Sequence, residues 1–533
     1  MVQSADLVGL KREVISKCLE QGILLGPDII QNINCNLDIN NFLGFISGKT
    51  QDSELLLCNE KVLGFLNEQE KINWFDFERF RSLYEQGKDK KAYLNFLEVL
   101  KKEKKEKRDD KVTPEDSNVQ VVFSYDKPSI KKDVQAFITY YNLRYTAIKN
   151  ILQHRHEMQD TTSINKLQNR RERGQVSLIG IVKEKITTPN NNFMFVLEDP
   201  TGCINVLVNK NRAELYNLAR EIVLDDTIGI VGMSGDNIVF ANSITLPDIP
   251  LNKELKKAKD EIYAVFLSDL HVGSDKFLPD QFNKFLSWIN GEVGGESQRQ
   301  IVDKIKYLFI IGDLVDGVGI YPDQDSELEI KDIYEQYEEC ARLLKRIPER
   351  IKLIICPGNH DAMRITEPQP KLYKDFAKAI WDLPNAILVS NPSLINIHSS
   401  KDFPGFDVLM YHGYSFDYFI SEVDPIREQG GYDRADLVMK FLLQRRHLSP
   451  SHTATLYIPD VENDPLVIEK VPDFFVTGHI HKTAAANYRN ITMICGSCWQ
   501  GKTTFQEKVG HHPEPARVPI VNLQTRQVKI LRF

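Results

Sequence analysis

The chain has 533 residues, 42% of them hydrophobic, which is enough for about two to four domains with sizeable cores. Its net charge of −7 and isoelectric point near 6.0 exclude a surface that binds nucleic acid through broad positive charge alone. We find neither an apolar signal core at the start nor a run of the roughly eighteen apolar residues that a membrane span needs. We therefore expect an intracellular protein without a membrane partner.

Residues 1–100 are predicted to form a helical N-terminal domain, because apolar residues from Leu7 to Leu19 recur at the three-and-four spacing of an amphipathic helix. Residues 101–119 are predicted to be a charged linker that begins with KKEKKEKRDDK. This run has seven basic and four acidic residues. A solvated helix end or a disordered linker explains it better than a DNA-binding tail, because the acids offset the bases.

Residues 120–250 are predicted to form an OB-fold domain, a small β-barrel often used for single-stranded nucleic acid. A helix is expected first, over residues 137–155. Hydrophobicity then alternates with a period of two, which is typical of half-buried strands. The expected order is strands 175–186, 192–199 and 203–209, a helix at 210–223, and strands 227–235 and 237–246. Five strands with a helix between the third and fourth is the order of an OB-fold.

Residues 251–533 repeat one pattern, in which a continuous apolar run ends in Asp, Asn or His. Such runs are typical of strands covered on both faces, and ligands of such sheets gather where the strands end. The residues at these ends are Asp269, His271, Asp313, Asn359, His360, Asp361, His412, His479 and His481. Five of the twelve histidines stand at these positions, so we interpret the set as a metal cluster rather than as separate caps and buried histidines.

The ligand types indicate an open catalytic site. Imidazole and carboxylate without thiolate suit manganese, iron or zinc, and magnesium is a further candidate. Seven candidate ligands exceed what one tetrahedral ion needs and suit two ions that share a carboxylate. Two such ions can clamp a phosphoryl group and activate a water molecule.

The blocks D-x-H, G-D, G-N-H-D, H-G and G-H-x-H, in this order, resemble the calcineurin-like metallophosphoesterases. The resemblance implies a two-sheet α/β domain with two divalent metal ions, most typically Mn²⁺. It implies that Asp269, His271, Asp313 and His481 hold the first ion, and that Asp313, Asn359, His412 and His479 hold the second. Asp313 is then the bridge. His360 is implied to be catalytic and to assist the leaving oxygen, with Asp361 orienting it.

An OB-like domain ahead of a phosphoesterase is similar to the B-subunit family of replicative DNA polymerases. The phrases SDLHVGS, GDLVDGVGIYP, PGNHDA, YHGYSFDY, PDFFVTGHIHK and WQGKTTFQ resemble those of the small-subunit family of archaeal DNA polymerase D. This resemblance implies a manganese-dependent 3′–5′ exonuclease that proofreads DNA primer–template beside the large catalytic subunit of the polymerase. It also implies a cytoplasmic, nucleoid-associated protein. The alternatives are a non-catalytic scaffold, against which the intact ligand set argues, and a stand-alone repair nuclease or small-molecule phosphodiesterase, against which the OB-like domain argues.

Three smaller features keep two interpretations each. Cys495 and Cys498 form one CxxC, which indicates buried thiols, although a disulfide is an alternative. Asp316 is either a support for the metal ligands or a helix cap. The terminal QVKILRF is either a final strand or a peptide that binds a sliding clamp, and its alternating apolar residues favour the strand.

Overall fold

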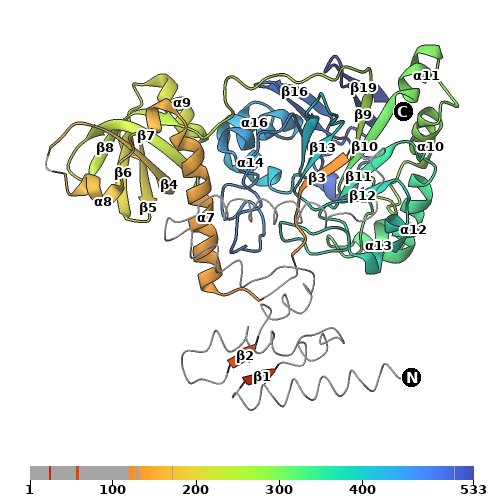
Figure 1. Ribbon diagram of the computed structural model, residues 1–533, viewed down its shortest axis with the longest axis horizontal. Coiled ribbons are helices and arrows are strands. Elements are labelled where there is room, and N and C mark those ends of the chain that lie inside the picture. The colour runs from red at the N-terminus through yellow and green to blue at the C-terminus, as the bar shows by residue number, and fades with distance from the viewer. Residues whose placement is uncertain (1–22, 26–55, 59–118, 128–130, 171, 509) are drawn as a thin grey trace, which may run out of the picture. The chain divides into compact units, whose positions relative to one another are not determined.

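The computed structural model describes residues 23–25, 56–58, 119–127, 131–170, 172–508 and 510–533 (Figure 1). The chain forms two compact units, Met1–Glu115 and Asp116–Phe533. In the first unit, the described residues are the strands β1 (Ile23–Leu25) and β2 (Leu56–Cys58), which pair in parallel. The helices predicted over residues 1–100 and the linker predicted over 101–119 otherwise lie outside the described residues.

A closed barrel forms the first part of the second unit, with strand order β4-β5-β6-β8-β7. Its elements are β4 (Gln175–Thr187), β5 (Phe193–Asp199), β6 (Gly202–Val208), α9 (Ala213–Glu221), β7 (Thr227–Ser234) and β8 (Ile238–Thr245). Every second residue of β6 and β7, such as Ile204, Val206, Ile228 and Ile230, enters a common core. The predicted strand order, with a helix between the third and fourth strands, is therefore present.

Three helical segments precede the barrel: α7 (Val134–Gln153), η1 (His156–Met158) and α8 (Ile164–Gln168). Helix α7 begins where the Asp133 side chain accepts a hydrogen bond from the backbone N–H of Ala136. Figure 1 shows α7 between the barrel and the larger α/β body.

The α/β body contains two six-stranded sheets, with orders β12-β11-β10-β9-β18-β19 and β16-β17-β15-β14-β13-β3. The strands of the first sheet are β9 (Tyr263–Leu267), β10 (Ile305–Ile311), β11 (Lys352–Cys356), β12 (Ala386–Leu388), β18 (Arg517–Asn522) and β19 (Val528–Arg532). The strands of the second sheet are β3 (Val119–Ser124), β13 (Ser393–Ile397), β14 (Phe406–Met410), β15 (Phe474–Thr477), β16 (Ala484–Tyr488) and β17 (Ile491–Cys495). Strands β9 to β12 run parallel, as do β14, β15 and β17.

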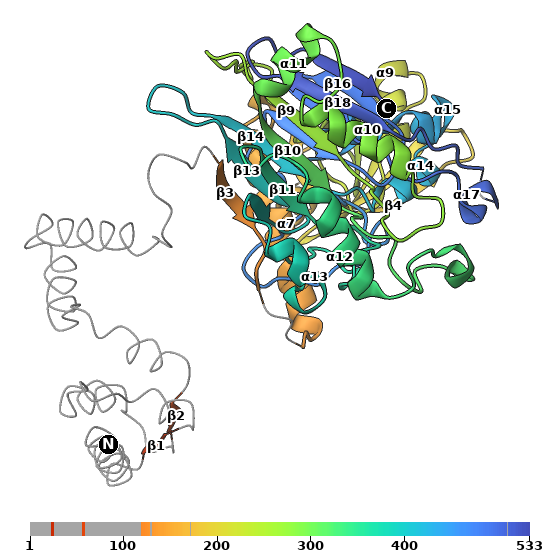
Figure 2. The same cartoon turned by 90° about the vertical axis from the view of Figure 1, so that its right-hand side faces the viewer.

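The two sheets are covered on both faces, which explains why their strands are apolar without alternation. In β9, Ala264 and Phe266 pack against residues of the second sheet, such as Phe474. Val265 and Leu267 of the same strand point the other way, into a core shared with the helices. The sheets therefore form the inner layers of a sandwich and helices form the outer layers (Figures 1 and 2).

The helices of this body divide between the two outer faces. Helices α10 (Pro279–Ile289), α12 (Ile333–Leu344) and α13 (Lys374–Trp381) contribute to the core on the first sheet, and α14 (Phe416–Glu422) and α16 (Ala435–Arg445) to the core on the second. The remaining helical segments are α11 (Glu296–Asp303), η2 (Gln324–Glu327), α15 (Asp424–Glu428), η3 (Gly431–Asp433) and α17 (Thr504–Lys508). None of the helices in the described part of the chain combines the length and the apolar character needed to cross a membrane.

Three observations bear on predictions made from the sequence: the pairing of β3, the structure of the last residues and the state of two cysteines. Strand β3 pairs with β13, so residues 119–124 extend a sheet of the α/β body, whereas the prediction assigned residue 119 to the linker and residues 120–124 to the barrel domain. The chain end forms strand β19, and the ring of Phe533 packs against Phe285 and Trp288, as the strand interpretation predicts. Cys495 and Cys498 are buried free thiols.

Helix α7 is fixed to the α/β body by a buried polar network centred on Asp464. The carboxylate of Asp464 accepts hydrogen bonds from Tyr140 Oη at 2.8 Å and from Arg144 Nε at 2.6 Å, and it lies 2.9 Å from His447 Nε2. Arg144 also donates to the carbonyl of Pro450. Burial alone would favour a neutral Asp464, but the adjacent Arg144 guanidinium holds the pKa of this carboxyl below its ordinary value.

We expect Arg144→Ala to destabilise the protein by about 3–5 kcal/mol, because it leaves the buried Asp464 charge without its cation. The lost stability should appear as a lower midpoint of thermal or urea denaturation. The matched control is Arg173→Ala, which removes an ion pair to Asp236 whose side chains are 67% and 89% exposed. This control should cost at most about 1 kcal/mol. Equal effects of the two substitutions would contradict the proposed role of the network.

Candidate metal centre

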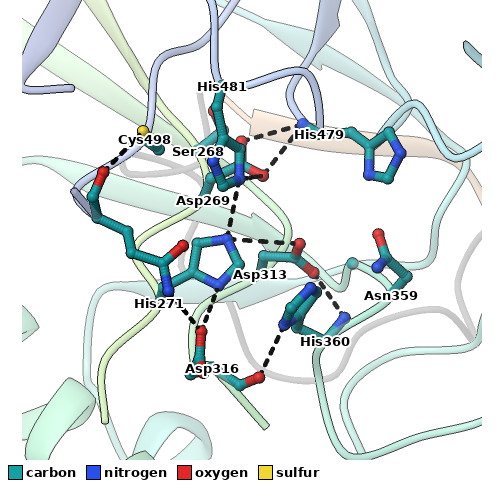
Figure 3. A network of polar contacts seen from close by, with 12 residues as sticks. Ser268, Asp269, His271, Asp313, Asp316, Asn359, His360, His479, His481 and Cys498 are labelled. Atoms are coloured by element: carbon teal, nitrogen blue, oxygen red, sulfur yellow. Dashed lines mark hydrogen bonds and ion pairs between the residues drawn. The ribbon is translucent and has the colours of Figure 1, made fainter. Parts of the chain in front are cut away.

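The site lies where strands of the two sheets end side by side. Asp269 follows β9, Asp313 follows β10 and Asn359 follows β11, all in the first sheet. His412 follows β14 and His479 follows β15, in the second sheet. The structure thus brings all seven predicted metal ligands together, from segments far apart in the chain. Figure 3 labels these residues with the exception of His412.

The first group consists of Asp269, His271 and His481, whose ligand atoms lie within 4.8 Å of one another. His481 Nε2 is 3.0 Å from His271 Nε2 and 3.4 Å from Asp269 Oδ1. All three side chains are nearly inaccessible to solvent. Two imidazoles and a carboxylate that point at one spot form a donor set suited to a divalent cation.

The second group consists of Asp313, His412 and His479, again within 4.8 Å. His412 Nε2 lies 3.2 Å from Asp313 Oδ2 and 2.9 Å from Asn359 Oδ1, so the amide oxygen joins this group. Asp313 Oδ2 is also 3.8 Å from His271 Nε2 of the first group. Asp313 therefore lies between the two groups, where a bridging carboxylate would lie.

The outer nitrogens of three imidazoles face groups that only accept hydrogen bonds. His271 Nδ1 lies 3.1 Å from Asp316 Oδ1, His412 Nδ1 lies 2.9 Å from the Ile311 carbonyl, and His479 Nε2 lies 2.9 Å from Asp417 Oδ2. Each outer nitrogen must therefore carry the proton, and in the neutral imidazole the inner nitrogen keeps its lone pair for a ligand bond. This is the tautomer that metal ligation requires, so the residues present fit divalent cations.

The buried negative charge of Asp313 also favours a cation. Burial works to raise the pKa of Asp313, but the neighbouring imidazoles of His412, His360 and His271 together hold the pKa well below its ordinary value. Conversely, burial opposes protonation of His412, yet the Asp313 charge raises the pKa of this imidazole to about 10. Protons on the histidines thus balance the buried carboxylates, and bound cations would replace those protons.

His360 and Asp361 lie beside these groups, but they do not form the pair that the sequence suggested. His360 Nδ1 is 2.7 Å from the Asp316 carbonyl oxygen and therefore donates to it, so in the neutral ring the lone pair is on Nε2. Asp361 instead accepts hydrogen bonds from the Gly358 N–H at 2.8 Å and the Tyr337 hydroxyl at 3.1 Å. The expectation that Asp361 orients His360 is wrong, because its carboxylate points into the protein and shapes the Gly358 turn.

The backbone at the ligands is held in an uncommon conformation. Five ligands have positive φ: Asp269, His271, Asp313, His479 and His481, with values between 52° and 70°. Such non-glycine residues cost on the order of 1–3 kcal/mol each and persist only where the surroundings enforce them. Here the N–H of His479 donates to the Asp269 carboxylate, and the N–H of Gly478 donates to the His412 carbonyl. These hydrogen bonds therefore hold the loops after β9, β14 and β15 in place relative to one another.

Several supporting residues were not identified from the sequence. Asp417 bonds to His479, and the Gln506 side chain lies 2.9 Å from His481 Nδ1. Asp316, for which two roles were open, supports His271 and accepts a hydrogen bond from Gln500 Nε2. The only signal for Asp417, Gln500 and Gln506 was their presence in the phrases YHGYSFDY and WQGKTTFQ. Nothing in the spacing of these phrases indicates that Asp417, Gln500 or Gln506 contacts a metal ligand.

Gly478→Ala tests the close packing behind the first group. A Cβ at this position would lie 2.6 Å from Asp269 Oδ2 and 2.9 Å from the Ile311 carbonyl oxygen, so Asp269 must move. We expect Mn²⁺ affinity to fall by about ten- to a hundredfold, the usual effect of disturbing a ligand's support. Isothermal titration calorimetry with Mn²⁺ measures the change. Gly295→Ala, whose Cβ would meet no atom within 4 Å, is the control and should bind as the wild type does. Unchanged affinity in Gly478→Ala would contradict the assigned geometry.

The comparisons with known proteins agree on the family to which the chain belongs. Residues 263–483 match the family model of the calcineurin-like phosphoesterases. The chain is 40% identical to the DNA polymerase II small subunit of Pyrococcus abyssi, over 75% of this chain and 63% of that protein. It is 37% identical to the DNA polymerase II small subunit of Methanothermobacter thermautotrophicus, over 75% of this chain and 80% of that protein. The match thus spans less than two thirds of the Pyrococcus abyssi relative and a larger share of the other. The prediction of the family is confirmed: the chain belongs to the archaeal DNA polymerase II small subunits and contains a calcineurin-like phosphoesterase domain.

Proposed function

We propose that this chain is the 3′–5′ exonuclease subunit of a two-subunit DNA polymerase and hydrolyses the 3′-terminal phosphodiester of a primer. The observation that carries the proposal is the complete donor set in two groups that share Asp313. A non-catalytic scaffold would not need five strained backbone positions and seven aligned donor side chains. Membership in a family of polymerase small subunits argues against a stand-alone repair nuclease.

Two divalent cations, for which Mn²⁺ is our first candidate, would be held by Asp269, His271, Asp313 and His481 and by Asp313, Asn359, His412 and His479. When bound, they would supply positive charge against the phosphate and would lower the pKa of a water molecule. Iron, zinc and magnesium are alternatives, because the donor set contains only nitrogen and oxygen.

Two of the chain's own residues, His360 and Asp316, have further tasks in this proposal. His360 presents Nε2 towards the substrate and, when protonated, can donate to the departing oxygen. Burial lowers the pKa of His360, and the nearby Asp313 charge opposes this effect, which favours the protonated ring. Asp316 holds two histidines at once, since its side chain bonds to His271 and its carbonyl to His360. The active groups are thus kept in a fixed mutual orientation.

We further propose that the barrel is an OB-fold and that the partners are the large catalytic subunit and a DNA primer–template. The net charge of −7 supports a large subunit that provides most of the DNA affinity, because a negatively charged chain does not attract the DNA backbone. A sliding-clamp peptide at the chain end is not proposed, since Phe533 is packed against α10.

The test is removal of a 3′-mismatched nucleotide from a primer–template in the presence of Mn²⁺, with the chain alone and with its large subunit. Asn359→Ala and His360→Ala should each lower the rate by about a hundredfold or more, as expected for a lost ligand and a lost proton donor. His154→Ala, at an exposed histidine beyond the end of α7, should match the wild type.

Two results would contradict the proposal. Wild-type protein that is inert in both settings would favour a scaffold. Turnover of bis(p-nitrophenyl) phosphate with DNA left intact would favour a small-molecule phosphodiesterase.

A further inference from the structure

An apolar pocket of about 410 Å³ opens directly beside Asn359 and His360. We call it the 317–320 pocket, and its lining residues are Gly317, Val318, Gly319, Ile320, Ile333, Asn359, His360, Asp361, Ala362, Met363 and Ile365. Val318, Ile320 and Ile365 are 50%, 39% and 37% exposed. Three branched apolar side chains thus face solvent at the edge of a polar site. Its volume lies in the range of about 300–1,000 Å³ that is typical of ligand pockets.

The loop that carries Val318 and Ile320 is held by two buried glutamines. The Gln336 side chain accepts a hydrogen bond from the Gly317 N–H at 3.0 Å and donates to the Gly317 carbonyl at 3.1 Å. Gln324 accepts from the Ile320 N–H at 2.8 Å and donates to the Asp316 carbonyl at 2.9 Å. The exposure of the two apolar side chains is therefore a fixed feature of the loop.

The same contacts tie the loop to the metal centre. The Asp316 carboxylate accepts from Gln324 and bonds to His271, and the Asp316 carbonyl bonds to His360. Gly317 has a φ of +78°, and a Cβ there would meet the His360 carbonyl oxygen. The loop and the catalytic histidine are thus positioned by one set of hydrogen bonds.

The polar groups of the pocket restrict what it can recognise. Its polar side chains are Asn359, His360 and Asp361. Asn359 faces His412, His360 donates to the Asp316 carbonyl, and the Asp361 carboxylate is used by Gly358 and Tyr337. The remaining lining is aliphatic or glycine. Such a surface suits the faces of a flat apolar group, and its aliphatic walls offer no side-chain hydrogen bond to the edge of a base.

We propose that the 317–320 pocket receives an unpaired nucleobase that adjoins the scissile phosphodiester. This inference rests on the proposed exonuclease function and adds how the site selects its substrate. A paired base must unstack and break its base pair to enter the pocket. A mismatched base has no such pair to break, so its entry costs less free energy. The aliphatic walls make the selection independent of base identity. Mispaired 3′ ends are therefore preferred because they free a base, and not because the pocket recognises a particular base.

The test combines a double variant with abasic substrates. Val318→Ser/Ile320→Ser shortens both exposed side chains, and Val293→Ser/Ile530→Ser is the control at two sites of 47% and 46% exposure elsewhere. Each protein, with its large subunit and Mn²⁺, is given three primer–templates: a mismatched 3′ end, and the same end with a tetrahydrofuran abasic analogue at the terminal or at the penultimate nucleotide. The measured quantity is kcat/KM for removal of the terminal nucleotide.

On the mismatched end, we expect the pocket variant to lose about tenfold in kcat/KM, the scale of losing apolar contacts to a substrate group. The wild type should lose a similar factor on one of the two abasic substrates. On that substrate the pocket variant and the wild type should agree, because there is no base left to bind. The control variant should match the wild type throughout.

Other outcomes would overturn the inference. Equal rates of wild type and pocket variant on the mismatched end would show that the pocket holds no base. A loss of the same factor on all three substrates would assign the apolar side chains to the fold or to a protein partner. In both cases exonuclease activity of the wild type would leave the proposed function intact, whereas a wild type that degrades none of the substrates would remove both.

Discussion

The structure depends on the compensation of buried negative charge where the two sheets meet. Asp269 and Asp313 are both almost fully buried, and ionised carboxylates in such places are costly unless cations or hydrogen bonds balance them. Histidines from both sheets provide that balance in the described structure, and bound cations would provide it in the active protein. The sheets, the ligand loops and the site are therefore parts of one electrostatic arrangement.

The fold makes this arrangement rigid. Strands covered on both faces cannot shift without disturbing two cores at once, since Phe266 faces one core and Val265 and Leu267 face the other. The loops that follow these strands are bonded to one another, with the Asp269 N–H donating to Gly312 and the His271 N–H to Asp313. The positive φ values of the ligands are the local cost of turning their side chains towards a common centre.

Much of this could be predicted from the sequence because its causes are local. A strand covered on both faces must be continuously apolar, and a polar residue at its end is therefore conspicuous, as in the run before Asp313. The barrel strands were visible through their alternation, and the first was predicted at 175–186 where the structure has Gln175–Thr187. Between the second and third of these strands, the Asp199 carboxylate accepts hydrogen bonds from the N–H groups of Thr201 and Gly202, as Asp side chains commonly do in turns.

The remaining features arise from contacts between distant segments. The pairing of β3 with β13 joins residues about 270 positions apart, which no periodicity reveals. Asp361 stands next to His360 in sequence, yet a turn sends its carboxylate to Tyr337 instead. Asp417 and Gln506 support His479 and His481 only because α14 and the segment after β17 lie against the ligand loops. Side chains of this kind become identifiable when the tertiary structure is known.

The most direct measurement is anomalous scattering from crystals of the protein grown or soaked in Mn²⁺. The account predicts two anomalous peaks on either side of the Asp313 carboxylate, one within ligand distance of Asp269, His271 and His481, and one within ligand distance of Asn359, His412 and His479. No anomalous peak at saturating Mn²⁺, or peaks only at residues outside these two groups, would contradict it.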